Sequence, residues 1–207
     1  MADKKIKRLR QGAVIEFVEK KSLFIGYAEI VKTEDEALAI IKSKKKEFAD
    51  ATHNVYAYMI GDDIARYSDD GEPQGTAGMP VLNSIRMSGI TDVLVVVTRY
   101  FGGILLGAGG LVRAYSTAAS MALEAGGEAI FESYAEVSVK CSYSDYGKMN
   151  TELSSYDVIV DGTLFEDEVT INFAVREDDY KKLTERIVDL FSGRICPTFK
   201  GKRIDTK

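Results

Sequence analysis

The chain has 207 residues, an apolar fraction of 45% and a formal net charge of -5. This length allows one large or two small globular domains with apolar cores. No segment reaches the roughly 18 consecutive apolar residues of a membrane span, and the charged N-terminus lacks the apolar region of a secretory signal, so we expect a cytoplasmic protein without a membrane partner.

The first part of the chain predicts a β-rich domain with helices. Runs of strand length predict strands at residues 14–18, 23–31, 55–60, 64–67 and 93–98. Helices are expected after Thr33, which precedes three acidic residues, from Pro80 to about residue 88, and from Gly109 to about residue 124. The strands at residues 55–60 and 64–67 are predicted to form a hairpin.

From about residue 134 the pattern changes. Its elements alternate as strand 135–141, helix 145–154, strands 158–165 and 169–175, helix 178–191 and strand 195–199. This βαββαβ order is typical of a ferredoxin-like domain. We therefore predict an α+β protein with two domains, residues 1–134 and 135–207.

Two cysteines, Cys141 and Cys196, lie far apart in the sequence without the spacing of a disulfide framework or a zinc site. The predicted strand order places them on neighbouring strands. They would form a redox pair there or, as is more common for free cysteine, pack as two small buried thiols.

Charge is unevenly distributed along the chain. Residues 1–50 carry an excess of three positive charges, whereas residues 51–134 and 135–207 are both acidic. The basic segment is either a solvated tail and helix face or an electrostatic footprint for RNA.

The segment TRYFGGILLGAGGLVRAYSTAA follows a buried strand and resembles a phosphate-binding loop. Gly102 and Gly107 have the spacing of a P-loop, but Ala108 and Gly109 replace the lysine and the hydroxyl residue that the P-loop needs. The dinucleotide fingerprint fails because Val112 stands at its third glycine. The sequence therefore predicts neither a P-loop hydrolase nor a dinucleotide enzyme.

An anion site without either motif remains open. Backbone N–H groups at the start of a helix are unpaired and face the positive end of its dipole, so they favour phosphate. Alternatively, the glycines allow close packing and the arginines pair with acidic residues of the preceding loop. The candidate RNA- or anion-binding residues are Arg99, Tyr100, Phe101, Gly102, Gly103, Gly109, Gly110 and Arg113.

A second polar block, SDDGEPQGTAG, forms a loop by composition. Its carboxylates offer oxygen ligands for magnesium, but such loops are more often solvated, so we predict no metal and no cofactor. The single histidine has no neighbouring Ser or Cys nucleophile and is expected to be a hydrogen-bonded structural residue; catalytic residues stay unassigned. The polar candidates are His53, Asp69, Asp70, Glu72 and Thr76.

Three blocks, HNVYAY, DDGEPQGTAGMPVL and VVVTRYFGGILLGAGGLVRAYSTAA, closely resemble the YigZ/IMPACT family in residues, order and spacing. The resemblance implies an N-terminal domain similar to the second domain of a small-subunit ribosomal protein, a β-α fold shared with translation factors. It implies a C-terminal ferredoxin-like domain similar to the last domain of the elongation factor that drives translocation.

Both likenesses indicate RNA or the ribosome as partner. Eukaryotic relatives regulate translation by binding an activator of an initiation-factor kinase through an additional domain, and that partnership is not carried over to these residues. Met79 and Leu105 stand where the family often has basic residues, which removes positive charge from the candidate surface.

The leading hypothesis is a non-enzymatic, translation-associated protein that binds RNA or the ribosome. One alternative is a phosphate-binding or magnesium-dependent enzyme domain that uses a cleft between DDGEPQGTAG and RYFGG. The other is a protein-interaction module whose exposed Tyr100 and Phe101 contact a partner protein.

Overall fold

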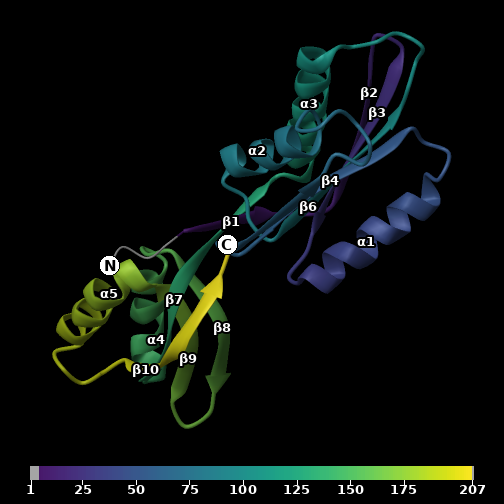
Figure 1. The fold of residues 1–207 in the computed structure, drawn as a ribbon. Helices are drawn as coiled ribbons and strands as arrows, with labels where there is room; N and C mark the ends of the chain where they lie inside the picture. Colours follow the sequence, from purple (N-terminus) through teal and green to yellow (C-terminus); the bar gives the residue numbers. More distant parts are fainter. Residues whose placement is uncertain (1–4, 207) are drawn as a thin grey trace. The chain divides into compact units, whose positions relative to one another are not determined.

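The computed structural model describes residues 5–206, which form two compact units (Figure 1). Residues 6–130 make up one unit, and residues 131–206 with Lys5 make up the other. The change of unit falls inside strand β7 (Glu128–Cys141), a few residues before the expected position at 134. Each unit is mixed α and β, which confirms the predicted fold class. Within residues 5–206, no helix is long and apolar enough to cross a membrane.

An antiparallel five-stranded sheet forms the centre of the N-terminal unit. Its strands lie in the order β2 (Ala13–Glu19), β3 (Ser22–Ile30), β6 (Val93–Tyr100), β4 (His53–Ile60) and β5 (Ile64–Ser68). The central strand β6 is buried on both faces: Val95 and Val97 belong to one apolar cluster, and Leu94 and Val96 to the other. This explains its continuous apolar run.

Helices cover both faces of this sheet (Figure 1). Helix α1 (Glu34–Glu47) packs on one face, and α2 (Gly78–Ser88) and α3 (Ala108–Gly126) pack on the other. Helix α1 begins as predicted, because the Thr33 hydroxyl accepts a hydrogen bond from the backbone N–H of Glu36 at 3.2 Å. Helix α3 lies so close to the sheet that a Cβ on Gly26 would stand 2.9 Å from the carbonyl oxygen of Ala118.

Strand β1 (Ile6–Leu9), which pairs with β7, was not predicted. Its sequence IKRL is only four residues long and half basic, so it lacks an apolar strand pattern. Lysines and arginines can nevertheless occupy an edge strand, because the pairing needs only the backbone.

The C-terminal unit confirms the βαββαβ order. It contains β7, α4 (Tyr143–Leu153), β8 (Val158–Phe165), β9 (Val169–Arg176), α5 (Glu177–Leu190) and β10 (Thr198–Asp205). Strand β7 lies between β10 and β9, and β8 forms the edge beyond β9, as in a ferredoxin-like sheet. Met149 and Leu153 of α4 and Leu183 and Ile187 of α5 join the strands in a single buried cluster.

The last strand differs from its prediction, and so does Cys196. Strand β10 begins at Thr198 and continues through the basic tail, because Arg203 in that tail pairs with Asp161, Glu136 and Asp205. Cys196 therefore precedes the strand and is exposed, whereas Cys141 is buried at the end of β7. Both thiols are free, so the expectation of two buried cysteines on neighbouring strands is wrong for Cys196.

Candidate functional site

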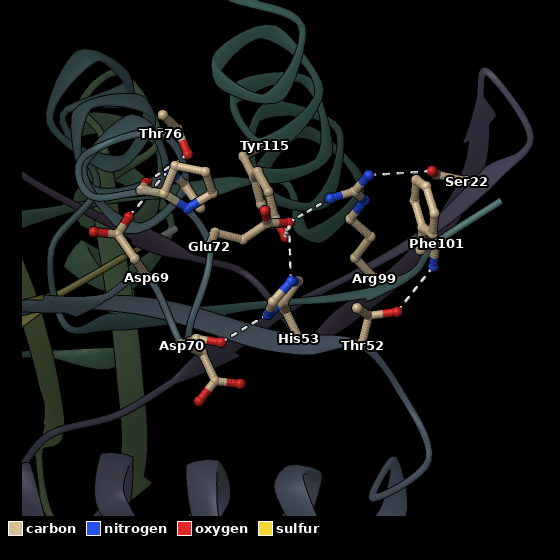
Figure 2. A network of polar contacts seen from close by, with 12 residues as sticks. Ser22, Thr52, His53, Asp69, Asp70, Glu72, Thr76, Arg99, Phe101 and Tyr115 are labelled. Carbon is tan, nitrogen blue, oxygen red and sulfur yellow. Dashed lines mark hydrogen bonds and ion pairs between the residues drawn. The ribbon is translucent and has the colours of Figure 1, made fainter. Parts of the chain in front are cut away.

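Glu72 is the centre of a buried polar network in the N-terminal unit (Figure 2). Its Oε1 accepts hydrogen bonds from Arg99 Nη1 at 2.6 Å and from the Tyr115 hydroxyl at 2.7 Å. The three side chains come from the β5–α2 loop, from β6 and from α3. Burial raises the pKa of Tyr115, and the neighbouring Glu72 carboxylate adds to the shift, so this hydroxyl stays protonated and donates.

Arg99 belongs to the sheet rather than to the surface. It is only 5% exposed, and its guanidinium carbon lies 5.6 Å from the ring centroid of Phe24 and 5.5 Å from that of Phe101. Its Nη2 donates to Ser22 Oγ at 3.3 Å, while Nε has no hydrogen-bond partner. Arg99 therefore pairs with an acid of the polar loop, which was one of the two roles left open by the sequence.

Asp69 caps helix α2 with its side chain. Its Oδ1 accepts hydrogen bonds from the backbone N–H groups of Ala77 and Gly78 at 3.1 and 2.8 Å, and its Oδ2 accepts one from Gly75 at 2.9 Å. The Thr76 hydroxyl donates to the Pro73 carbonyl at 2.7 Å. Much of the block SDDGEPQGTAG thus stabilises a helix start and its own turn.

Asp70 and His53 join this loop to strand β4. The Asp70 carboxylate accepts a hydrogen bond from the backbone N–H of Asn54 at 2.7 Å and forms an ion pair with Lys45. His53 Nδ1 lies 2.8 Å from the Asp70 carbonyl oxygen. Because a carbonyl only accepts, Nδ1 carries the hydrogen, and in the neutral ring Nε2 is left as an acceptor.

The three loop carboxylates do not converge on one point. Asp69 faces the start of α2, Asp70 faces β4 and Lys45, and Glu72 faces Arg99 and Tyr115. Across residues 5–206, no cluster of three or more His, Cys, Asp or Glu side chains has an arrangement suited to a metal ion.

The β6–α3 loop is fixed at its start and open further along. The backbone N–H of Phe101 donates to Thr52 Oγ1 at 3.0 Å, and that of Gly102 donates to Ser22 Oγ at 3.2 Å. A Cβ on Gly102 would stand 2.0 Å from the backbone of Lys21, so only glycine fits against this turn. The hydrogen bond to Asp50 raises the pKa of Tyr100.

Arg113 has the opposite surroundings to Arg99. It is exposed on the first turns of α3 and makes no hydrogen bond or ion pair with any residue between 5 and 206. The N-cap of the same helix is Gly107, which has φ 72° and provides no side-chain cap, and the first turn holds no acidic residue. Gly109 and Gly110 leave this positive helix end accessible.

A pocket of about 350 Å³ lies between these two regions. Its polar part is formed by Thr52, His53, Glu72 and Arg99. Its apolar part is formed by Pro73, Phe101, Leu105, Leu106 and Leu111, next to the start of α3. The structure therefore brings His53, Glu72, Arg99 and Phe101 together around one pocket, and it places Asp69 and Thr76 outside its lining.

A larger cavity of about 670 Å³ lies between α2 and α3. Serines such as Ser84 and Ser120 and the apolar Met87 line it, with Glu124 and Glu128 at its margin. The hydroxyl of Ser84 already donates to backbone carbonyls of Pro80 and Ser116. The smaller pocket is the better candidate, because buried charged groups converge there.

Several residues of the network were not predicted. Tyr115 and Ser22 partner Glu72 and Arg99, and Thr52 fixes Phe101. Tyr115 was detectable in part, since a tyrosine within an alanine-rich buried helix face needs a hydroxyl partner. Ser22 and Thr52 lie far from Arg99 in the sequence and carry no local signal.

Comparison with known proteins assigns both halves of the chain. The profile described as Impact N-terminal domain matches residues 20–123, and a domain of unknown function, DUF1949, matches residues 139–194. A solved structure titled as a hypothetical protein superimposes with a TM-score of 0.60 at 27% identity, covering 95% of this chain and 98% of the other.

Similar proteins include bacterial and eukaryotic sequences. The IMPACT family member YvyE of Bacillus subtilis is 38% identical over 188 residues, which is 90% of this chain and 87% of that protein. The IMPACT family member YigZ of Escherichia coli is 32% identical over 180 residues, 85% and 88% of the two chains. The Protein IMPACT of Rattus norvegicus is 34% identical over 104 residues, 48% of this chain and 32% of its own length.

Proposed function

Because the chain belongs to the IMPACT family, we propose that it binds RNA, free or within the ribosome, and acts on translation without catalysing a reaction. The family resemblance implies that its two domains are similar to domains of a ribosomal protein and of an elongation factor, and this implied similarity supports the proposal. The surface around the start of α3 supports it independently.

The observation that carries the proposal is the exposed arginine at an uncapped helix start. Arg113 is exposed, and a Cβ on Gly109 would lie 3.6 Å from its Nη1, so the guanidinium lies close to the free N–H groups of the first turn. A phosphate at this point would receive backbone hydrogen bonds and a charge-assisted bond from the same helix.

Further positive charge adjoins this helix start. Lys20 and Lys21 form the exposed turn between β2 and β3, and the backbone of Lys21 packs against Gly102 of the β6–α3 loop. Phe101, at 45% exposure, lies beside them and borders the same pocket as Ala108 of α3. Basic side chains around an exposed aromatic ring are typical of a surface for single-stranded RNA.

The lysines of α1 contribute less than the composition suggested. Lys44 pairs with Glu47 and lies 3.9 Å from the ring centroid of Tyr27, and Lys45 pairs with Asp70. The proposed RNA surface is therefore centred on Lys20, Lys21 and Arg113 rather than on the lysine run of residues 42–46.

Co-sedimentation with ribosomes and filter binding of ribosomal RNA test the proposal with the full chain. We expect binding at low salt that weakens as salt rises, with a logarithmic slope of roughly -0.7 per phosphate contact to single-stranded RNA. Absence of binding to both RNA and ribosomes at low and at moderate salt would refute the proposal.

A further inference from the structure

The carboxylate of Glu72 has one oxygen that is not used by the buried network. Its side chain is only 3% exposed, and Oε1 takes both hydrogen bonds from Arg99 and Tyr115. Oε2 accepts no hydrogen bond from residues 5–206. Within that range, the side-chain N and O atoms that lack a partner and are closed to solvent are Arg99 Nε and Arg203 Nε, and Oε2 is not among them. Oε2 is therefore an acceptor without a partner in that range and is not fully closed to solvent, on a side chain that lines the pocket.

His53 presents a second acceptor to the same pocket. Its Nδ1–H is held by the Asp70 carbonyl at 2.8 Å, which directs the lone pair of the neutral ring to Nε2. Nε2 lies 3.7 Å from Glu72 Oε1, which is too far for a hydrogen bond. Because His53 and Glu72 line the same pocket, a ligand with two neighbouring N–H donors would satisfy both acceptors.

The walls of the pocket are largely apolar. Phe101 is 45% exposed and its backbone N–H is held by Thr52, so its ring is accessible to a ligand. Leu105, Leu106 and Leu111 face the same space. The volume of about 350 Å³ lies at the lower end of the usual range for small-ligand sites, roughly 300–1,000 Å³.

The charge of the pocket favours a neutral ligand over an ammonium or guanidinium group. Arg99 already stands 2.6 Å from Glu72 and compensates its negative charge. A second buried cation would meet Arg99 without a free counter-charge and would lose its hydration. A neutral heteroaromatic ring with N–H donors satisfies the acceptors and the apolar walls together.

We infer that this pocket receives one unpaired guanine of the bound RNA, stacked on Phe101, with its N1–H and N2–H groups donating to Glu72 and His53. Guanine is the RNA base whose ring N–H and amino group are adjacent donors. Adenine and cytosine offer an amino group beside an acceptor nitrogen, and uracil offers one N–H between two carbonyls. The inference rests on the proposed RNA binding and adds base recognition to it.

Short oligouridines with a single central substitution test this pocket on the full chain by fluorescence anisotropy at low salt. The central nucleotide is guanosine, inosine (which lacks the N2 amino group), uridine or an abasic site. We expect the guanosine oligomer to bind about tenfold more tightly than the abasic one, since one stacked base contributes roughly that much, with inosine in between.

Two exposed residues of the same loop provide a matched pair of variants. Phe101 lines the pocket, whereas Ile104, 42% exposed, does not. Phe101→Leu should lower the affinity for the guanosine oligomer to that for the abasic oligomer, and Ile104→Ala should keep the difference between the two. Both variants should melt at the wild-type temperature, because neither side chain belongs to the buried core.

Each outcome separates the pocket from the RNA surface. Equal binding of the guanosine and abasic oligomers would overturn the guanine pocket and leave the RNA proposal standing, whereas no binding of any oligomer would overturn both. An equal loss from Phe101→Leu and Ile104→Ala would indicate a general apolar docking loop instead. If guanosine monophosphate displaces the guanosine oligomer when both are at the same concentration, the pocket binds a free nucleotide rather than a base of the RNA.

Discussion

Arg99 and Arg113 belong to one sequence block but have opposite environments. Arg99 ends a central strand, is 5% exposed and pairs with Glu72, whereas Arg113 is exposed on α3 and has no partner among residues 5–206. The first arginine stabilises the fold and shapes the pocket floor, and the second is available to an external anion. Two residues of one type in the same block thus differ in burial and pairing, and only Arg113 is placed for the anion binding that we propose.

We expect the largest loss of stability from a change to the buried pair of Arg99 and Glu72. Glu72→Ala leaves Arg99 buried and unpaired, so we expect a loss of about 3–5 kcal/mol in the free energy of unfolding. Urea unfolding of the full chain followed by circular dichroism measures it. As a control, Glu124→Ala on the exposed face of α3 should change stability by less than about 0.5 kcal/mol.

A double variant sharpens the same point. Adding Arg99→Met to Glu72→Ala removes the unpaired charge, so the double variant should be more stable than Glu72→Ala alone. If the double variant is less stable by the full sum of two independent losses, the two residues are not energetically coupled and the network interpretation fails.

Tyr115→Phe should have an intermediate effect. It removes the hydroxyl that donates to the Glu72 carboxylate while keeping the ring in the core, so we expect a loss of about 1.5–3 kcal/mol in urea unfolding. Tyr67→Phe is the matched control, because that tyrosine is 43% exposed and its hydroxyl makes no hydrogen bond within residues 5–206. Similar losses for both would contradict the assigned role of Tyr115.

We expect the smallest effect on stability from a change to the exposed Arg113. Arg113→Ala should leave the unfolding free energy within about 0.5 kcal/mol of the wild type, yet weaken RNA binding and reduce its salt slope by about one unit. Arg86→Ala, an exposed arginine in the last turn of α2, is the control for general loss of positive charge. An unchanged slope for Arg113→Ala would remove this residue from the proposed RNA surface.

The fold was predictable where local patterns are strong. Thr33 with its following acids marked the start of α1, and the apolar run of β6 marked a strand covered on both faces. Strand β1 and the full length of β10 were missed, because basic residues interrupt their apolar pattern and their pairing with β7 has no local signal in the sequence. The prediction for Cys196 was wrong because β10 begins at Thr198, after this residue, rather than at residue 195.

The candidate site was predictable as a set of residues but not as an arrangement. The sequence predicted that Arg99 would either bind an anion or pair with a neighbouring acid. The residue types alone are compatible with both alternatives. The pairing of His53 with Arg99 across β4 and β6 brings one histidine and one arginine side by side. No spacing along the chain indicates that register.

By itself, the sequence determined the order of the elements, apart from β1, and the two α+β units, because periodicity, caps and glycine turns act over short stretches of chain. The family came from the resemblance of three sequence blocks. Only the tertiary structure decided that Glu72, Tyr115 and Arg99 share one buried network while Arg113 remains free. The physical reason is that burial and pairing depend on which loop and helix cover a strand end, and these come from distant parts of the chain.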